Sequence, residues 1–151
     1  MELLFKITGM FLLFCASSFG GFFKTFSLKK RVEILGEINR SLGRLAGFIS
    51  ARQGETEKLV NLSFPPHVLK MENGKFIFDT LFLEKGDIAL INEFLRDLGA
   101  NDTQNEYERT LSYAELFRNL FTAAEEKFSA LGRLYSTSGV LCGVLICIFF
   151  I

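Results

Sequence analysis

The stretches ITGMFLLFCASSFGGFF (residues 7–23) and LYSTSGVLCGVLICIFFI (residues 134–151) are uncharged and apolar, and they lie near the two ends of the sequence. At about 1.5 Å of rise per helical residue, each approaches the roughly 30 Å thickness of a bilayer's hydrocarbon layer. A soluble domain, the competing interpretation, has little reason to place its two most apolar stretches at its ends. We therefore expect two transmembrane helices, residues 1–23 and 134–151, on either side of a central domain, residues 24–133.

A cleaved signal peptide is the other interpretation of the first run. Glu2 and a single Lys6 make a poor positively charged start, and no sharp small-x-small cleavage site follows. An uncleaved anchor fits these residues better.

Basic residues give the expected orientation. The short outer tails hold only Lys6, whereas the central segment carries basic residues beside both runs: Lys24, Lys29, Lys30, Arg31, Lys127 and Arg133. By the positive-inside rule, the central domain should be cytoplasmic and both termini should lie outside the cytoplasm. The cluster at residues 29–31 should set this topology and touch anionic lipid headgroups.

Composition and motifs argue against nucleic acid as a partner and against catalytic activity. The sequence has 17 basic and 17 acidic residues, without the positive excess that nucleic-acid binding needs. Cys15, Cys142 and Cys147 lie in the apolar runs, and the lone histidine, His67, belongs to no recognisable motif. We expect no catalytic residue, no metal site and no cofactor, and hence a protein that is not an enzyme.

Helical periodicity dominates the central segment. Apolar residues in its first half recur at steps of three and four: Leu35, Ile38, Leu42, Leu45 and Ile49, extended backwards by Leu28 and Val32. A second seam with the same steps leads into the last run: Ala114, Phe117, Phe121, Ala124, Phe128, Leu131 and Tyr135. The seams predict an all-α fold, a membrane-anchored antiparallel helical bundle in which Val32 lies near Ala124.

The segment between the seams is less regular. Residues 87–98 have the pattern of a short amphipathic helix, Gly99 that of its left-handed C-cap, and Asn101 or Asp102 that of the next N-cap. Residues 76–78 fit a strand by periodicity alone, but in an otherwise helical chain we expect a helix at residues 75–83.

Glycines indicate where helices approach closely. Those of the first long helix fall near one line, away from the apolar seam: Gly36, Gly43, Gly47 and Gly54. Gly139 and Gly143 repeat a small-xxx-small pattern in the second run. Chance, or a helix that breaks near Gly54, would also give the first pattern. The functional interpretation is a groove for another helix, in this chain or in a partner.

Three patches in order resemble the stage III sporulation protein AB family of spore-forming bacteria. They read Arg31-x-x-x-Leu35 after the first run, Phe94-x-x-x-Leu98-Gly99-x-x-Asp102 before the last long helix, and Tyr135-x-x-x-Gly139-x-Leu-x-Gly143-x-Leu in the second run. The sequence departs from the family pattern at residues 48–54, and Glu106 stands where the family has glutamine.

The resemblance implies a subunit of the channel in the mother-cell membrane around the forespore. The family's cytoplasmic domain is similar to the platform protein of type II secretion systems and type IV pili. It therefore implies three partners: the membrane, a separate cytoplasmic assembly ATPase and other channel subunits. An oligomer is compatible with it.

Two other functions compete with this platform role. One is a generic membrane-anchored coiled-coil scaffold without an ATPase partner. The other is an enzyme with a membrane-embedded site, but the apolar runs lack the ionisable residues that such a site needs.

Overall fold

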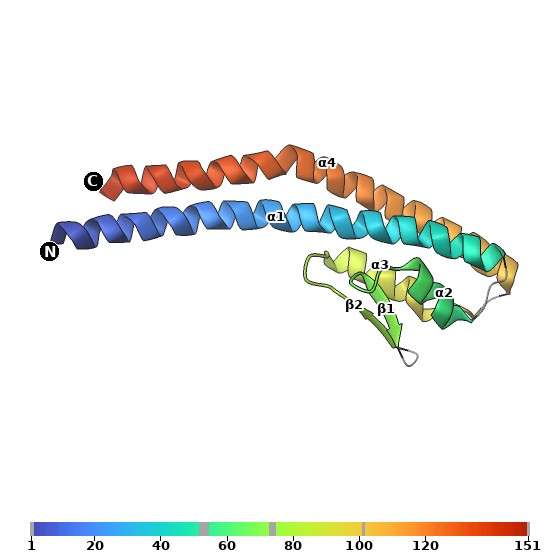
Figure 1. Ribbon diagram of the computed structural model, residues 1–151. Coiled ribbons are helices and arrows are strands. Elements are labelled where there is room, and N and C mark those ends of the chain that lie inside the picture. Colours follow the sequence, from blue (N-terminus) through green and yellow to red (C-terminus); the bar gives the residue numbers. More distant parts are fainter. Residues whose placement is uncertain (1, 52–54, 73–74, 101, 151) are drawn as a thin grey trace. The chain divides into compact units, whose positions relative to one another are not determined.

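The computed structural model describes residues 2–51, 55–72, 75–100 and 102–150; for residues 2–7, 10, 13, 147, 149 and 150 it describes the backbone only. The elements follow in the order α1 (Glu2–Ser50), α2 (Thr56–Ser63), β1 (Leu69–Glu72), β2 (Lys75–Phe78), α3 (Lys85–Arg96) and α4 (Thr103–Phe150) (Figure 1). The expected helical architecture is confirmed, except that residues 69–78 contain two strands.

The chain forms two compact units. The first contains residues 1–30 and 125–151, which are the N-terminal part of α1 and the C-terminal part of α4. The second contains residues 31–124, with the rest of both long helices and everything between them. Neither long helix contains a proline, so each runs uninterrupted for its full length.

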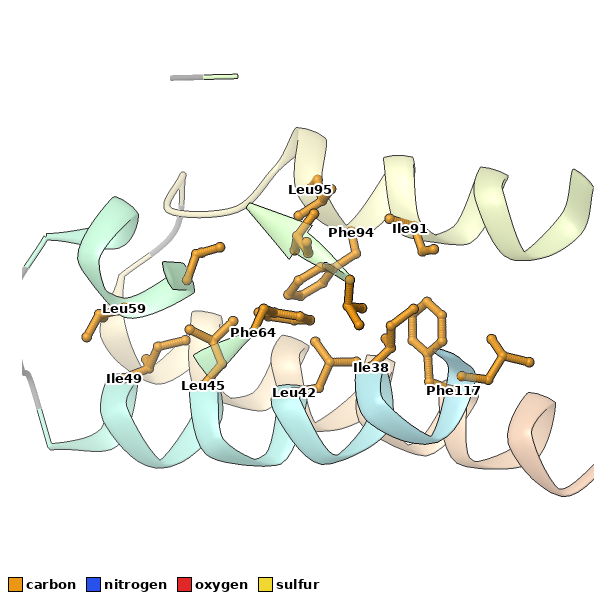
Figure 2. Packing of buried hydrophobic residues seen from close by; sticks show 14 of the residues in the cluster. Ile38, Leu42, Leu45, Ile49, Leu59, Phe64, Ile91, Phe94, Leu95 and Phe117 are labelled. Carbon is orange, nitrogen blue, oxygen red and sulfur yellow. The ribbon is translucent and has the colours of Figure 1, made fainter. Parts of the chain in front are cut away.

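The core of the second unit forms around the predicted seam of α1. The seam is confirmed: Val32, in its backward extension, is half-buried, and the other members are buried, namely Leu28, Leu35, Ile38, Leu42, Leu45 and Ile49. Figure 2 shows this seam meeting side chains from α2, α3 and α4 in one cluster. The burial of these large apolar side chains is the main stabilising term of the unit.

The predicted seam of α4 is confirmed in part. Phe117 is 1% exposed and Ala124 is 3% exposed, but Tyr135 is 37% exposed, so the prediction was wrong for Tyr135. A Cβ built on Gly36 would lie 3.0 Å from Cε2 of Phe121. This contact fits the antiparallel register in which Val32 and Ala124 are neighbours.

The expected helix at residues 75–83 is wrong. β1 and β2 form an antiparallel hairpin in which Glu72 lies opposite Lys75. The two residues between them in the sequence are Asn73 and Gly74, the dipeptide that most favours a two-residue hairpin. Alternate side chains pack on the core: Leu69, Met71, Phe76 and Phe78. The burial of every second side chain therefore favours strands here, although most of the chain is helical.

α2 is held against this hairpin. It ends at Ser63 because Phe64 precedes a proline and is extended, with φ −102° and ψ 136°. The side chain of Asn61 donates to the carbonyl of Met71 and accepts from its N–H, each at 3.0 Å. The Asn61 amide thus pairs with both backbone groups of Met71, as a neighbouring strand would.

α3 and the turn after it follow the sequence pattern closely. Of the expected face, Ile91 and Leu95 are buried, while Ile88 and Leu98 are half-buried. Gly99 has φ +84°, which confirms the left-handed turn. Of the two predicted N-caps of α4, Asn101 lies outside the described residues. The carbonyl of Asp102 accepts the N–H of Glu106 at 2.9 Å, which closes the first turn.

Candidate functional site

A buried ion-pair cluster ties α1 to α3 in the second unit. Arg31 and Asp87 share two hydrogen bonds, from Nε to Oδ2 at 2.8 Å and from Nη2 to Oδ1 at 3.0 Å. Nη1 of Arg31 also donates to Oε1 of Glu84 at 2.8 Å. The side chains of Arg31 and Asp87 are 11% and 2% exposed. A bidentate pair of this kind fixes orientation as well as distance, so it holds the start of α3 at one point on α1.

The carboxylates of Glu84 and Asp87 are held in position by the first turn of α3. Glu84 at the N-cap and Asp87 at the third helical position form a capping box, in which the N–H of Glu84 donates to Oδ2 of Asp87 at 3.0 Å. The hydrogen bonds with Asp87 raise the pKa of Arg31 above its ordinary value. Because Arg31 is enclosed here, it does not reach lipid headgroups, and the expected headgroup cluster at residues 29–31 is wrong for this residue.

A second arginine links the end of α3 to the start of α4. Nη2 of Arg109 donates to the carbonyl of Phe94 at 3.2 Å and to Oε1 of Glu106 at 3.0 Å. Its guanidinium lies 5.3 Å and 5.6 Å from the ring centroids of Phe94 and Tyr113. Burial raises the pKa of the Tyr113 hydroxyl. Glu106 is thus a buried acid matched by a cation.

In the first unit, α1 and α4 touch through two glycines. A Cβ on Gly21 would lie 2.5 Å from the carbonyl oxygen of Tyr135 and 3.1 Å from Cα of Gly139. A Cβ on Gly139 would in turn lie 3.1 Å from Cα of Gly21. Side chains at these positions would force the two backbones apart.

Two hydroxyls bridge the same pair of helices. Oγ of Ser17 donates to the carbonyl of Gly139 at 3.0 Å, and Oγ1 of Thr25 donates to that of Gly132 at 2.8 Å. Our sequence interpretation missed this contact on α1. Its signal is the four-residue spacing of Ser17, Gly21 and Thr25, a small-xxx-small pattern that begins in the first run and ends just after it.

Three of the predicted interaction glycines are covered from within the chain. Gly36 faces the ring of Phe121, and Gly139 faces α1, as described above. A Cβ on Gly143 would lie 2.8 Å from Cδ2 of Phe14. The close approach expected at these glycines therefore occurs inside the chain.

Two others are open. Gly43 and Gly47 are exposed, and a Cβ on either would meet no heavy atom within 4 Å. Gly54 lies outside the described residues.

Many outward-facing side chains of the first unit are large and apolar. On α1 they are between 48% and 72% exposed: Phe11, Leu12, Phe19, Phe22, Phe23 and Phe26. On α4 the corresponding residues are Leu134, Leu141, Val144, Leu145 and Ile148. Within the described part of the chain, α4 alone is long and apolar enough by composition to cross a membrane. Two such helices were expected.

Groups suited to chemistry are sparse. No three His, Cys, Asp or Glu side chains of the described residues are grouped so that they could hold a metal ion. Nε2 of His67 lies 3.0 Å from Oε2 of Glu37 on an exposed surface. Cys15 and Cys142 are exposed free thiols.

The residues that resemble family motifs occupy structural positions. Leu35 and Phe94 lie in the core, Arg31 forms the buried ion pair, and Leu98 is half-buried. Gly99 makes the left-handed turn, Asp102 begins α4, and the backbone of Tyr135 meets Gly21. The motifs therefore mark how the fold is held together.

A family model described as stage III sporulation protein AB matches residues 73–151, just over half of the chain, from the turn of the hairpin to the end. Neither the curated proteins nor the solved structures include a significant match.

Arg31→Ala should lower the free energy of unfolding of the full chain in detergent by about 3–5 kcal/mol, because it leaves the Asp87 carboxylate buried without its cation. Lys29→Ala, which removes an exposed charge two residues earlier, should change it by less than about 0.5 kcal/mol. Denaturant titration followed by circular dichroism measures both. Equal losses would contradict a buried ion pair.

Gly21→Leu should separate α1 from α4 in the first unit, because the new side chain would overlap the backbone of Tyr135. The measurement is the yield of a disulfide between cysteines placed at positions 25 and 132, in a chain whose three native cysteines are replaced by alanine. Gly20→Leu is the matched control, since a Cβ there meets nothing within 4 Å. We expect most of the crosslink to be lost with the first variant only; an unchanged yield would refute the close approach.

Proposed function

The chain belongs to the stage III sporulation protein AB family, and we propose that it is a non-enzymatic membrane platform subunit of a sporulation channel complex. In this role it engages a separate cytoplasmic ATPase. Family membership makes it a sporulation-related protein. The platform role rests on the similarity of the family's cytoplasmic domain to the platform protein of type II secretion systems and type IV pili.

The observation that carries the proposal is the inverted character of the first unit. Its inner surface includes Gly21, Gly139 and two bridging hydroxyls, while the outer surface of its two apolar runs carries large apolar side chains. Water would oppose this arrangement, whereas lipid chains solvate the outer surface and leave packing and hydroxyl bonds to hold the helices. We infer that both helices cross the membrane, over residues 1–23 and 134–151.

The proposed orientation keeps the second unit in the cytoplasm and both termini outside it. Exposed basic side chains lie beside both apolar runs on the same side: Lys24, Lys29, Lys127 and Arg133. This bias holds without Arg31, whose charge is used inside the second unit. We place the protein in the mother-cell membrane around the forespore.

The second unit suits a role in binding. Its buried ionisable groups are used to hold helices together: Arg31 with Asp87, and Arg109 with Glu106. A rigid body on a membrane anchor can transmit the work of an ATPase without chemistry of its own. A coiled-coil scaffold without an ATPase partner would share the anchor and the seams, so the partner separates the two functions.

A cysteine in place of Lys70 should remain unlabelled by a membrane-impermeant maleimide added to intact cells. Lys70 is exposed on β1, so only the membrane should protect it. The chain again lacks its native cysteines, and permeabilised cells serve as the control in which labelling should appear. Labelling in intact cells would reverse the orientation and remove the cytoplasmic ATPase from the proposal.

The full chain in lipid nanodiscs should bind the assembly ATPase of the same complex, measured by sedimentation of the purified proteins. Arg31→Ala, which loosens the second unit and leaves the anchor intact, should weaken this binding. Empty nanodiscs are the control. Binding no greater than to empty nanodiscs would exclude the platform role and favour the scaffold.

A further inference from the structure

Four residues of α1 form an exposed basic face, which we call the arginine–glycine face. It comprises Arg40, Gly43, Arg44 and Gly47, all exposed, at positions i, i+3, i+4 and i+7. Residues with this spacing share one stripe of a helix. The two glycines have no heavy atom within 4 Å of a built Cβ, so the chain's own α4 does not cover this stripe.

The two arginines of this face are not neutralised. Nε of Arg40 donates to the carbonyl of Gly36 at 3.3 Å, and Nη2 of Arg44 donates to Oγ of Ser41 at 3.0 Å. Neither forms an ion pair with any described carboxylate. The arginines also line an open groove with Glu37 and Pro65. The carboxylate of Glu37 is engaged by His67 at 3.0 Å.

Four residues of α4 form an exposed face with the same spacing and the opposite charge. This glutamate–leucine face comprises Glu108, Leu111, Ser112 and Glu115, all exposed. Oε1 of Glu108 accepts only a neutral side-chain amide, that of Gln104 at 2.7 Å, and Glu115 has no ion pair among the described residues. Leu111 is 42% exposed, an apolar side chain on an otherwise polar stripe.

We propose that the arginine–glycine face of one copy of the chain binds the glutamate–leucine face of a second copy. Both stripes follow the i, i+3, i+4, i+7 pattern. One carries two positive charges, at i and i+4, and the other carries two negative charges, at i and i+7. The glycines let a second helix approach closely, and Leu111 supplies a side chain to fill the space that they leave. Opposite charge on the two faces favours this partner.

This contact is of the head-to-tail kind. Each copy presents both faces, so a bound pair still has one free face of each type, and further copies can add until a ring closes. The contact involves only the second unit and does not depend on the ATPase. It adds to the proposed function a way of repeating the platform around a channel.

The test uses charge reversal in the full chain, reconstituted in detergent at low ionic strength, with self-association measured by sedimentation velocity. The double variant Arg40→Glu/Arg44→Glu should weaken self-association about tenfold or more, since like charges would then face each other. Combining it with Glu108→Arg/Glu115→Arg should restore self-association. Lys58→Glu reverses a charge on α2 whose side chain is 74% exposed, and it should have no effect.

A further variant tests the glycines. Gly43→Leu should leave the thermal midpoint of the chain unchanged or raised, because the site is open and leucine favours helix, while it weakens self-association. The proposal would be overturned if the wild-type chain stayed monomeric. It would also be overturned if the variant with all four charge reversals did not regain self-association. Loss of ATPase binding without loss of self-association in Arg40→Glu/Arg44→Glu would also overturn it and would assign the face to an acidic surface of that partner.

Discussion

The close approach of α1 and α4 at Gly21 and Gly139 constrains the surroundings of the first unit. Two helices that meet through glycine have little apolar area between them, so most of their large apolar side chains face outward; Phe14, which packs against Gly143, is an exception. Under the proposed function, lipid takes the place of water around this exterior. Under the proposed function the apolar composition of the two runs has a structural cause: small and hydroxylated residues form the contact between the helices, and the exposed large ones face the bilayer.

Arg31 shows how the second unit is fastened to a helix that continues into the first. Arg31 is the first residue of the second unit, and it binds Asp87 and Glu84 at the start of α3. A buried arginine–carboxylate pair adds less to stability than apolar packing of the same volume, but it admits only one orientation. The pair therefore determines where α3 and the elements before it sit on α1. Under the proposed function, such fixed geometry is what a platform needs.

The helical seams were predictable because periodicity reports burial directly, and Leu35 to Ile49 are buried as their spacing requires. The turn at Gly99 was predictable because a left-handed residue after a helix is most easily glycine. The hairpin was missed because the helical character of the whole chain was given more weight than the local signal of Asn73 and Gly74. The partner of Arg31 could not be predicted from the sequence, since Asp87 is 56 residues away and no local pattern joins the two.

For the predicted interaction glycines, too, the sequence indicated one property and left another open. Gly139 and Gly143 were identified from their spacing, but spacing does not tell whether the approaching helix belongs to the same chain. The structure supplies that information, with Gly21 and Phe14 as the neighbours. Gly43 and Gly47 stay open, and only the charges around them indicate what could cover them.

Lipid exposure of the first unit is the most direct test of its inverted character. Nitroxide labels at positions 12, 19 and 141, where side chains are 63%, 72% and 58% exposed, can be examined in bilayers by electron paramagnetic resonance. The account predicts frequent collisions with oxygen, which concentrates in lipid, and few with a water-soluble nickel chelate; a label at Lys70 should show the reverse. Frequent collisions with the nickel chelate at all three positions would place the first unit in water and contradict the account.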